Sequence, residues 1–188
     1  PEDPTITPGV NADATVQRYL GRGVPSDKLV LGVPFYGRAV QGVPNVNGGL
    51  FQSYTGTPLG TWDDATSGAT GMFDYADIVL NYLGQPGIDA YREPDSGVPW
   101  LHEPSSGLFL SYDDPASLLL KKQYVQANGL GGVMIWEMSS DLNDQLLDAL
   151  ITGAPVSNVP ALSPGALGLL AVLLAFTARS SKRKVKTR

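Results

Sequence analysis

Two apolar segments of this 188-residue sequence end in side chains that could bind a polar ligand. Trp136 and Glu137 follow the apolar run 130–135, and Tyr36 follows the apolar run 28–35. A flat indole at the end of a strand can stack on the apolar face of a ring-shaped ligand, and the Tyr36 hydroxyl can form hydrogen bonds. Neighbouring strand residues point to opposite faces, so Glu137 is expected to turn partly away from Trp136.

The acidic pairs could also suggest acid–base chemistry, but their neighbours favour structural roles. Asp113 and Asp114 precede Pro115, which suits the first position of a helix, so an aspartate capping that helix is the preferred interpretation. The pair 63–64 is interpreted as a turn, and Asp74 is expected to face solvent.

The Cys and His content excludes several kinds of site. The chain has no Cys, which excludes a disulfide framework, a Cys-ligated metal and a Cys nucleophile. Its single histidine, His102, excludes a multi-histidine metal site. His102 lies in a stretch flanked by Pro, Ser and Gly, where we expect a loop and a surface or packing role.

The periodicity of apolar residues predicts the elements that position these side chains. Strands buried on both faces are expected at 28–35 and 130–136, and helices are expected at 11–20, at 73–83, at 113–127 and from Asp141 onward. The alternation of helices and strands predicts βα units around a parallel sheet.

The stretch 36–112 is too long for a simple crossover between parallel strands, and it is rich in Gly, Pro, Ser and aromatic residues. We therefore expect an inserted subdomain there. Two parallel strands do not make a stable sheet alone, so further strands are expected before Pro1.

The net charge of −5 conceals a division along the chain. Residues 179–188 hold six basic and no acidic residues, whereas residues 1–178 carry a net charge of −11. An acidic body repels nucleic acid. The basic end directly follows the apolar, uncharged run 165–178, which predicts contact with a membrane.

Three groups of residues, in this order and spacing, resemble glycoside hydrolase family 18, the chitinases. The groups are Lys28–Arg38, the pair of motifs Gly60-Thr-Trp62 and Gly71-Met-Phe-Asp-Tyr75, and the segment from Ser111-Tyr-Asp-Asp114 to Trp136-Glu137. The resemblance implies an α/β fold, namely the C-terminal portion of a (β/α)8 TIM barrel with an inserted α+β subdomain, followed by a C-terminal hydrophobic helix.

The resemblance also implies an activity. Members of the family hydrolyse β-1,4-linked N-acetylglucosamine with retention, by a substrate-assisted mechanism that needs no metal or organic cofactor. The acid motif of the family, Asp-x-x-Asp-x-Asp-x-Glu, does not occur in this sequence and is expected upstream. The chain therefore contributes no catalytic residue, and we predict that it is inactive alone. Two alternatives remain open, a non-catalytic, lectin-like chitin-binding protein and a structural envelope protein.

The resemblance assigns substrate contacts to particular side chains. Trp136 would form the floor of the subsite that holds the reacting sugar, Tyr36 would border the pocket, and Arg38 would act as a structural ion-pair partner. The remaining substrate-binding candidates are Tyr75, Arg92, Glu137 and Trp100. Trp62 could be either an exposed sugar platform or a packing residue of the insertion.

The resemblance divides the chain into six parts. They are a barrel segment (1–38), the insertion subdomain (39–111), the last barrel segment (112–153), a linker (154–164), a membrane or sorting helix (165–178) and a basic cytoplasmic tail (179–188). The tail resembles bacterial C-terminal sorting signals, so we expect a secreted or envelope protein that is anchored or sorted at its C-terminus. The expected partners are chitin or N-acetylglucosamine oligomers, a membrane and a sorting peptidase, and no nucleic acid.

Overall fold

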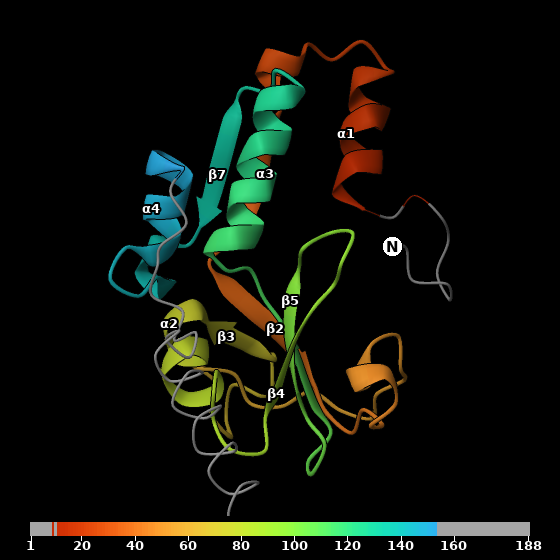
Figure 1. Cartoon of the computed structure of the whole chain (residues 1–188), viewed down its shortest axis with the longest axis vertical. Coiled ribbons are helices and arrows are strands. Elements are labelled where there is room, and N and C mark those ends of the chain that lie inside the picture. Colours follow the sequence, from red (N-terminus) through yellow and green to blue (C-terminus); the bar gives the residue numbers. More distant parts are fainter. Residues whose placement is uncertain (1–8, 10, 154–188) are drawn as a thin grey trace, which may run out of the picture. The chain divides into compact units, whose positions relative to one another are not determined.

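The computed structural model describes residue 9 and residues 11–153 (Figure 1). The helices are α1 (Ala12–Leu20), α2 (Tyr75–Asp77), α3 (Pro115–Ala127) and α4 (Gln145–Thr152), with shorter helical turns at Ser26–Lys28, Asn47–Gly49, Ile78–Tyr82 and Met138–Ser140. The strands are β1 (Val30–Pro34), β2 (Tyr36–Val40), β3 (Met72–Asp74), β4 (Asp89–Arg92), β5 (Pro99–Glu103), β6 (Leu108–Ser111) and β7 (Gly132–Trp136).

The strands form two sheets. Strands β1 and β7 pair in parallel, with Val30 opposite Gly132 and Pro34 opposite Trp136, which confirms the predicted parallel pairing. The other five strands form an antiparallel sheet in the order β3-β2-β6-β5-β4. All five strands come from the stretch 36–111, and their sheet lies at the end toward which β1 and β7 run (Figure 1).

Phe35 joins the two sheets. Its backbone N–H donates to the carbonyl of Trp136 at 2.8 Å, and its carbonyl accepts from the backbone N–H of Tyr75 at 3.0 Å. The Phe35 side chain is fully buried in the main hydrophobic core. The C-terminal ends of both parallel strands are therefore fixed against the start of β2 and the end of β3.

The ends of α1 and α3 follow their local sequence. The Asn11 side chain caps α1 by accepting from the Ala14 N–H at 2.8 Å. Asp114 caps α3 by accepting from the Ser117 N–H at 2.9 Å, and the Ser117 hydroxyl accepts from the Asp114 N–H. The predicted aspartate cap is confirmed, and α3 ends at Ala127 as predicted.

Two predicted helices begin later than the sequence suggested. Phe73 belongs to β3, where it pairs with Gly37, and the helical segment starts at Tyr75. Helix α4 starts at Gln145 rather than at Asp141. Asp141 still caps α4 from outside, because its carboxylate accepts from the backbone N–H groups of Leu146 and Leu147.

The prediction that the parallel strands are buried on both faces is wrong for the described residues. One face, which includes Val33 and Ile135, packs into the core. On the other face the side chains of Val30 and Met134 are 56% and 49% exposed. The reason is the size of the sheet, because α3 packs on β1 and β7 while the described residues provide no further parallel strand beside them.

His102 lies on β5 rather than in the predicted loop. Its side chain is fully buried, with Nε2 3.4 Å from the carbonyl oxygen of Val43. Of the surface and packing roles expected, the structure shows packing, since β5 is paired on both sides and residues 99–102 are all buried.

The predicted linker, hydrophobic helix and basic tail (154–164, 165–178 and 179–188) lie outside the described residues. Within residues 11–153, none of the helices combines the length and the apolar character needed to cross a bilayer.

Candidate functional site

Trp136 and Tyr36 both lie where the parallel strands end. Trp136 is the last residue of β7 and lies opposite Pro34, and the hydrogen bond from Phe35 N to Trp136 O places Tyr36 directly after this junction. The Trp136 side chain is 60% exposed although indole is a large apolar group. The end of β7 therefore presents an aromatic side chain to solvent, and its predicted contact with sugar stays a prediction.

Glu137 follows Trp136 through a cis peptide bond. Its side chain is exposed, and its carboxylate accepts a hydrogen bond from the Ser139 hydroxyl at 2.9 Å. The exposed carboxylate could still accept a hydrogen bond from a ligand through its other oxygen. Sugar contact by Glu137 stays a prediction.

The ring of Tyr36 is partly covered by a cation. The guanidinium carbon of Arg38 lies 5.6 Å from the centroid of the Tyr36 ring, because residues two apart on a strand share a face. This contact holds a positive charge beside the half-buried Tyr36. The structure thus gives Arg38 a contact with the Tyr36 ring, whereas the ion pair that the family resemblance implied for Arg38 stays a prediction.

Tyr75 is buried rather than presented to solvent. Its hydroxyl donates to Oε1 of Gln145 on α4 at 3.1 Å. Burial raises the pKa of this phenol strongly, and the negative charge of Asp114 raises it further. The Tyr75 hydroxyl is therefore a neutral group that ties the start of α2 to α4, and sugar contact by this side chain stays a prediction.

Arg92 is engaged by its own protein. Its guanidinium forms an ion pair with the carboxylate of Asp114 and donates to the carbonyl of Gly97 at 2.6 Å. Asp114 also caps α3, so Arg92 joins the end of β4 to the start of that helix. The side chain remains partly exposed, which leaves room for the predicted sugar contact.

Trp100 belongs to a stack of aromatic rings. Its ring lies 5.2 Å from that of Tyr91 and 6.3 Å from that of Phe109, measured between centroids, and its indole N–H donates to the carbonyl of Gly48 at 2.9 Å. The side chain is buried. Both faces of the indole are therefore used in packing, and the predicted sugar contact by Trp100 would have to occur at the ring edge.

Asp74 makes contacts that the sequence did not predict. It was expected to face solvent, but it is half-buried and its carboxylate accepts from the Trp62 indole N–H at 2.8 Å and from the Ser140 hydroxyl at 2.9 Å. Its partners lie 12 and 66 residues away in the chain, so no local pattern could have indicated these contacts.

Asp63 and Asp64 form the predicted turn. Asp63 accepts from the N–H groups of Gly60 and Thr70, and these hydrogen bonds lower the pKa of its carboxyl. Asp64 accepts from the N–H groups of Thr66 and Ser67, with the same effect on its pKa. The acidic pair therefore stabilises a loop, as predicted.

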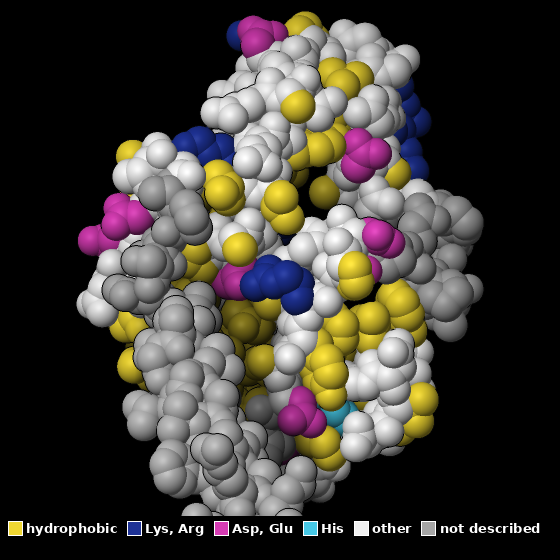
Figure 2. All heavy atoms as spheres, in the orientation of Figure 1, with side chains coloured by type: hydrophobic (Ala, Val, Ile, Leu, Met, Phe, Trp, Pro, Cys, Tyr) yellow, Lys and Arg dark blue, Asp and Glu magenta, His cyan; other side chains and the backbone are white. Residues whose placement is uncertain are grey.

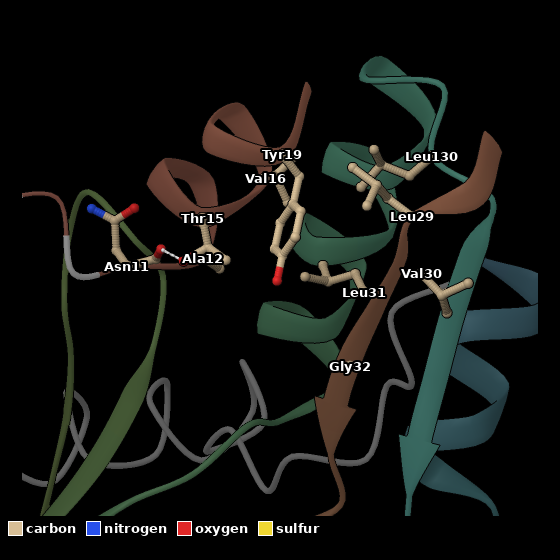
Figure 3. A pocket seen from close by; sticks show the side chains of 10 residues that line it. All are labelled: Asn11, Ala12, Thr15, Val16, Tyr19, Leu29, Val30, Leu31, Gly32 and Leu130. Atoms are coloured by element: carbon tan, nitrogen blue, oxygen red, sulfur yellow. Dashed lines mark hydrogen bonds between the residues drawn. The ribbon is translucent and has the colours of Figure 1, made fainter. Parts of the chain in front are cut away.

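A pocket of about 420 Å³ lies between α1 and β1, apart from the strand ends (Figure 3). Figure 3 shows the Tyr19 ring of α1 on one side of it and Leu31 of β1 on another. None of the six predicted substrate-binding residues lines this pocket, and its lining contains no carboxylate. It offers apolar surface rather than groups for proton transfer.

Charged side chains do not form a continuous patch of one sign on the face shown in Figure 2. Figure 2 shows acidic and basic side chains there interspersed with hydrophobic ones. A continuous basic surface is not seen on that face of the described residues.

Comparisons with known proteins identify the relatives of this chain. The family model for glycosyl hydrolases family 18 matches residues 3–141. Among curated proteins, Chitinase A1 of Niallia circulans is 39% identical over 84% of this chain, and Chitinase B of Serratia marcescens is 34% identical over 75% of it. The chain spans only 22% and 31% of the lengths of these two relatives.

Solved structures agree with the sequence comparisons. Chitinase ChiA74 from Bacillus thuringiensis matches 83% of this chain with a TM-score of 0.74 and 36% identity, and the match covers 28% of that protein. Chitinase ChiW from a Paenibacillus strain, described as a cell-surface-expressed multi-modular enzyme, matches 77% with a TM-score of 0.66 and 37% identity, over 12% of its own chain.

Proposed function

Because this chain belongs to glycosyl hydrolases family 18, we propose that it forms part of a chitinase, which hydrolyses polymers of β-1,4-linked N-acetylglucosamine. The named relatives, all chitinases, support this substrate. They are longer than this chain, so the proposed activity belongs to the intact protein, and the 188 residues supply part of its substrate-binding surface.

The observation that carries the proposal is the exposed indole of Trp136 at the C-terminal end of β7. Ligands of (β/α) barrels bind at this end of the strands. The CH groups on one face of a pyranose ring can pack on an indole, and the neighbouring Tyr36 hydroxyl and Glu137 carboxylate can bond to sugar hydroxyl or amide groups. An aromatic floor with polar groups at its edge is suited to an uncharged sugar.

The proposed chemistry is substrate-assisted hydrolysis with retention. A glutamic acid protonates the glycosidic oxygen as the bond to the anomeric carbon breaks, and the acetamido oxygen of the same sugar attacks that carbon. Water then opens the cyclic intermediate and returns a proton to the glutamate. The acid motif does not occur in these 188 residues, so here Trp136 and its neighbours hold the sugar in place.

The proposal separates two activities that can be measured independently. The 188-residue chain alone should release no sugar from chitin, while the intact protein should do so. If the residues encoded before Pro1 contain the family motif with its final Glu replaced, the protein is the lectin-like alternative, which binds chitin without cleaving it.

The experiment that tests the binding role is the Trp136→Ala substitution in the intact protein. We expect binding to insoluble chitin to weaken about tenfold or more, because a stacked aromatic contact is lost. Tyr54→Ala, which removes another exposed aromatic side chain, should leave binding unchanged and serves as the control. Equal binding by the Trp136→Ala variant and the unsubstituted protein would overturn the assignment of this site.

We also propose that the protein is secreted and held at the cell envelope through residues 165–178. Support comes from the sequence, where an uncharged apolar run is followed by six basic residues, and by analogy from the cell-surface expression described for Chitinase ChiW. Removing residues 165–188 should move the protein from the membrane fraction to the medium. An unchanged distribution would contradict the proposal.

A further inference from the structure

Trp62 is the most exposed of the large hydrophobic side chains in the described part of the chain, with 81% of its surface accessible. Isolated exposed apolar side chains are common and need no explanation. Trp62 differs because its orientation is fixed, since its indole N–H donates to Oδ2 of Asp74 at 2.8 Å. Most of the ring is open to solvent although its polar edge is held.

The loop on both sides of Trp62 is also held in place. Before it, the Thr61 hydroxyl donates to Oδ2 of Asp77 at 2.6 Å and accepts from the backbone N–H of Asp74 at 3.0 Å. After it, Oδ2 of Asp63 accepts from the N–H and the hydroxyl of Thr70, each at 2.7 Å. The indole is therefore presented by a well-bonded loop rather than by a freely moving one.

Asp74 connects this ring to the strand ends that carry Trp136. Its second oxygen, Oδ1, accepts from the hydroxyl of Ser140, in the short helical turn that follows Trp136 and Glu137. Asp74 also lies directly opposite Tyr36 in the β2–β3 pair, and residues paired in this way project to the same face of a sheet. One carboxylate thus holds the Trp62 indole on the Tyr36 side of the sheet and anchors the segment after Trp136.

This arrangement contributes little to folding. Burying an aromatic side chain removes apolar surface from water and stabilises the fold, and the exposed position of Trp62 forgoes most of that gain. A rigid, exposed indole instead provides a flat apolar surface at a small cost in side-chain entropy when a ligand binds. A sugar ring of the polymer is a ligand of matching shape and chemistry.

We propose that Trp62 is a further sugar-stacking residue and that Asp74 is its positioning residue. Trp62 would bind an N-acetylglucosamine unit of the same polymer that lies on Trp136. This inference rests on the proposed function, because it takes chitin as the ligand. It adds a binding position outside the six residues predicted from the sequence.

The first test measures the affinity for a soluble N-acetylglucosamine hexamer by calorimetry, in an intact protein whose acid-motif glutamate is replaced by glutamine so that the hexamer is not cleaved. Trp62→Ala should raise the dissociation constant about threefold to tenfold, and Trp62→Phe should restore most of the affinity because phenylalanine keeps a stacking face. Tyr54→Ala is the matched control and should bind like the unsubstituted protein. Unchanged affinity in Trp62→Ala would overturn the inference.

The second test asks whether Asp74 acts through Trp62. Asp74→Ala should weaken binding, but the double variant Trp62→Ala/Asp74→Ala should be no weaker than Trp62→Ala, because the carboxylate has no ring left to position. Additive losses would contradict the positioning role. Ser140→Ala removes the other hydrogen bond of Asp74 and should change affinity less than Asp74→Ala.

A spectroscopic signal distinguishes positioning from general destabilisation. In protein labelled with 5-fluorotryptophan, the resonance that disappears in Trp62→Phe belongs to Trp62. This resonance should shift when the hexamer is added, and it should move in Asp74→Asn without ligand. If the hexamer shifts the Trp136 resonance alone, the inference fails while the proposed function stands. If neither resonance shifts and Trp136→Ala binds normally, the proposed function fails.

Discussion

At the scale of single residues, Tyr112 shows how burial controls a titratable group beside the candidate site. Its side chain is buried, and burial raises the pKa of its phenol to about 12 from the ordinary value of 10.0. Asp114 adds to the rise, whereas Arg92 opposes it. The native fold therefore stabilises the neutral phenol.

The raised pKa predicts how stability depends on pH. Below pH 10 the phenol is neutral in both states, but between pH 10 and pH 12 only the unfolded state loses the proton. The free energy of unfolding should therefore fall across this window, by up to about 1.4 kcal/mol per pH unit. Urea denaturation at several pH values measures this slope.

The Tyr112→Phe variant isolates this contribution. It should show a smaller loss of stability across the same window, and Tyr75→Phe should act in the same direction because burial also raises the pKa of Tyr75. Tyr54→Phe, which removes the hydroxyl of an exposed tyrosine, is the control. A slope unchanged by Tyr112→Phe would show that other groups cause the alkaline loss.

Residues whose roles depend on nearby sequence were predictable, and residues whose roles depend on distant contacts were not. An aspartate cap could be predicted because Pro115 follows the acidic pair, and the structure shows that Asp114 is the cap. Asp74 could not be assigned, since Trp62 and Ser140 reach it only after β3 has paired and the chain has returned from β7. The burial of Trp100 was also hidden, because Tyr91 and Phe109 cover it from adjacent strands.

At the scale of elements, β2 depends on a close approach at Gly37. A Cβ atom added there would lie 2.7 Å from Cδ1 of Ile78, 2.9 Å from Cδ2 of Leu110 and 3.0 Å from the Ser111 carbonyl oxygen. The absence of a side chain lets the Ile78 segment pack directly on the sheet. This packing holds Tyr36 and the start of α2 in place.

Gly37→Ala should therefore destabilise the protein. We expect the free energy of unfolding to fall by about 1–3 kcal/mol, the range for overpacked cores, as measured by thermal or urea denaturation. Gly56→Ala is the matched control, because a Cβ there meets no atom within 4 Å, and it should be neutral or slightly stabilising. Equal stability of the two variants would contradict this account of the packing.

The apolar periodicity of the sequence predicted which helices and strands form better than it predicted which of their faces are buried. The parallel pairing of β1 with β7 followed from the alternation of helices and strands, and the apolar faces of α4 and of residues 78–83 pack as expected. The burial of β1 and β7 was predicted wrongly. An apolar run shows that both faces of a strand could be buried, but it does not show whether another element covers each face. The delayed start of α4 depends on the Asp141 cap from outside the helix.

At the scale of the whole molecule, the described part leaves an apolar sheet face uncovered. Val30 and Met134 lie on this face of β1 and β7, and Trp136 ends it. Residues 1–154 produced alone should therefore bind the dye ANS and be poorly soluble.

Polar substitutions on this exposed face of β1 and β7 should reduce dye binding and improve the solubility of residues 1–154. Val30→Thr combined with Met134→Thr should lower ANS fluorescence and raise solubility, since threonine keeps a high preference for strands. Leu59→Thr, at another exposed apolar position, is the control and should change little. A sharp near-ultraviolet spectrum with cooperative unfolding and no dye binding would contradict the prediction.

The pairing of Val30 with Gly132 also sets an order of events during synthesis. At roughly 5–20 residues per second, a ribosome completes β7 about 5–20 s after β1. All five strands of the antiparallel sheet have left the ribosome before β7 does, and their pairings can form in the interval. The nascent chain would therefore hold a folded antiparallel sheet beside β1, whose β7-facing edge stays unpaired, and a chaperone that binds extended apolar segments would find that edge available until β7 emerges.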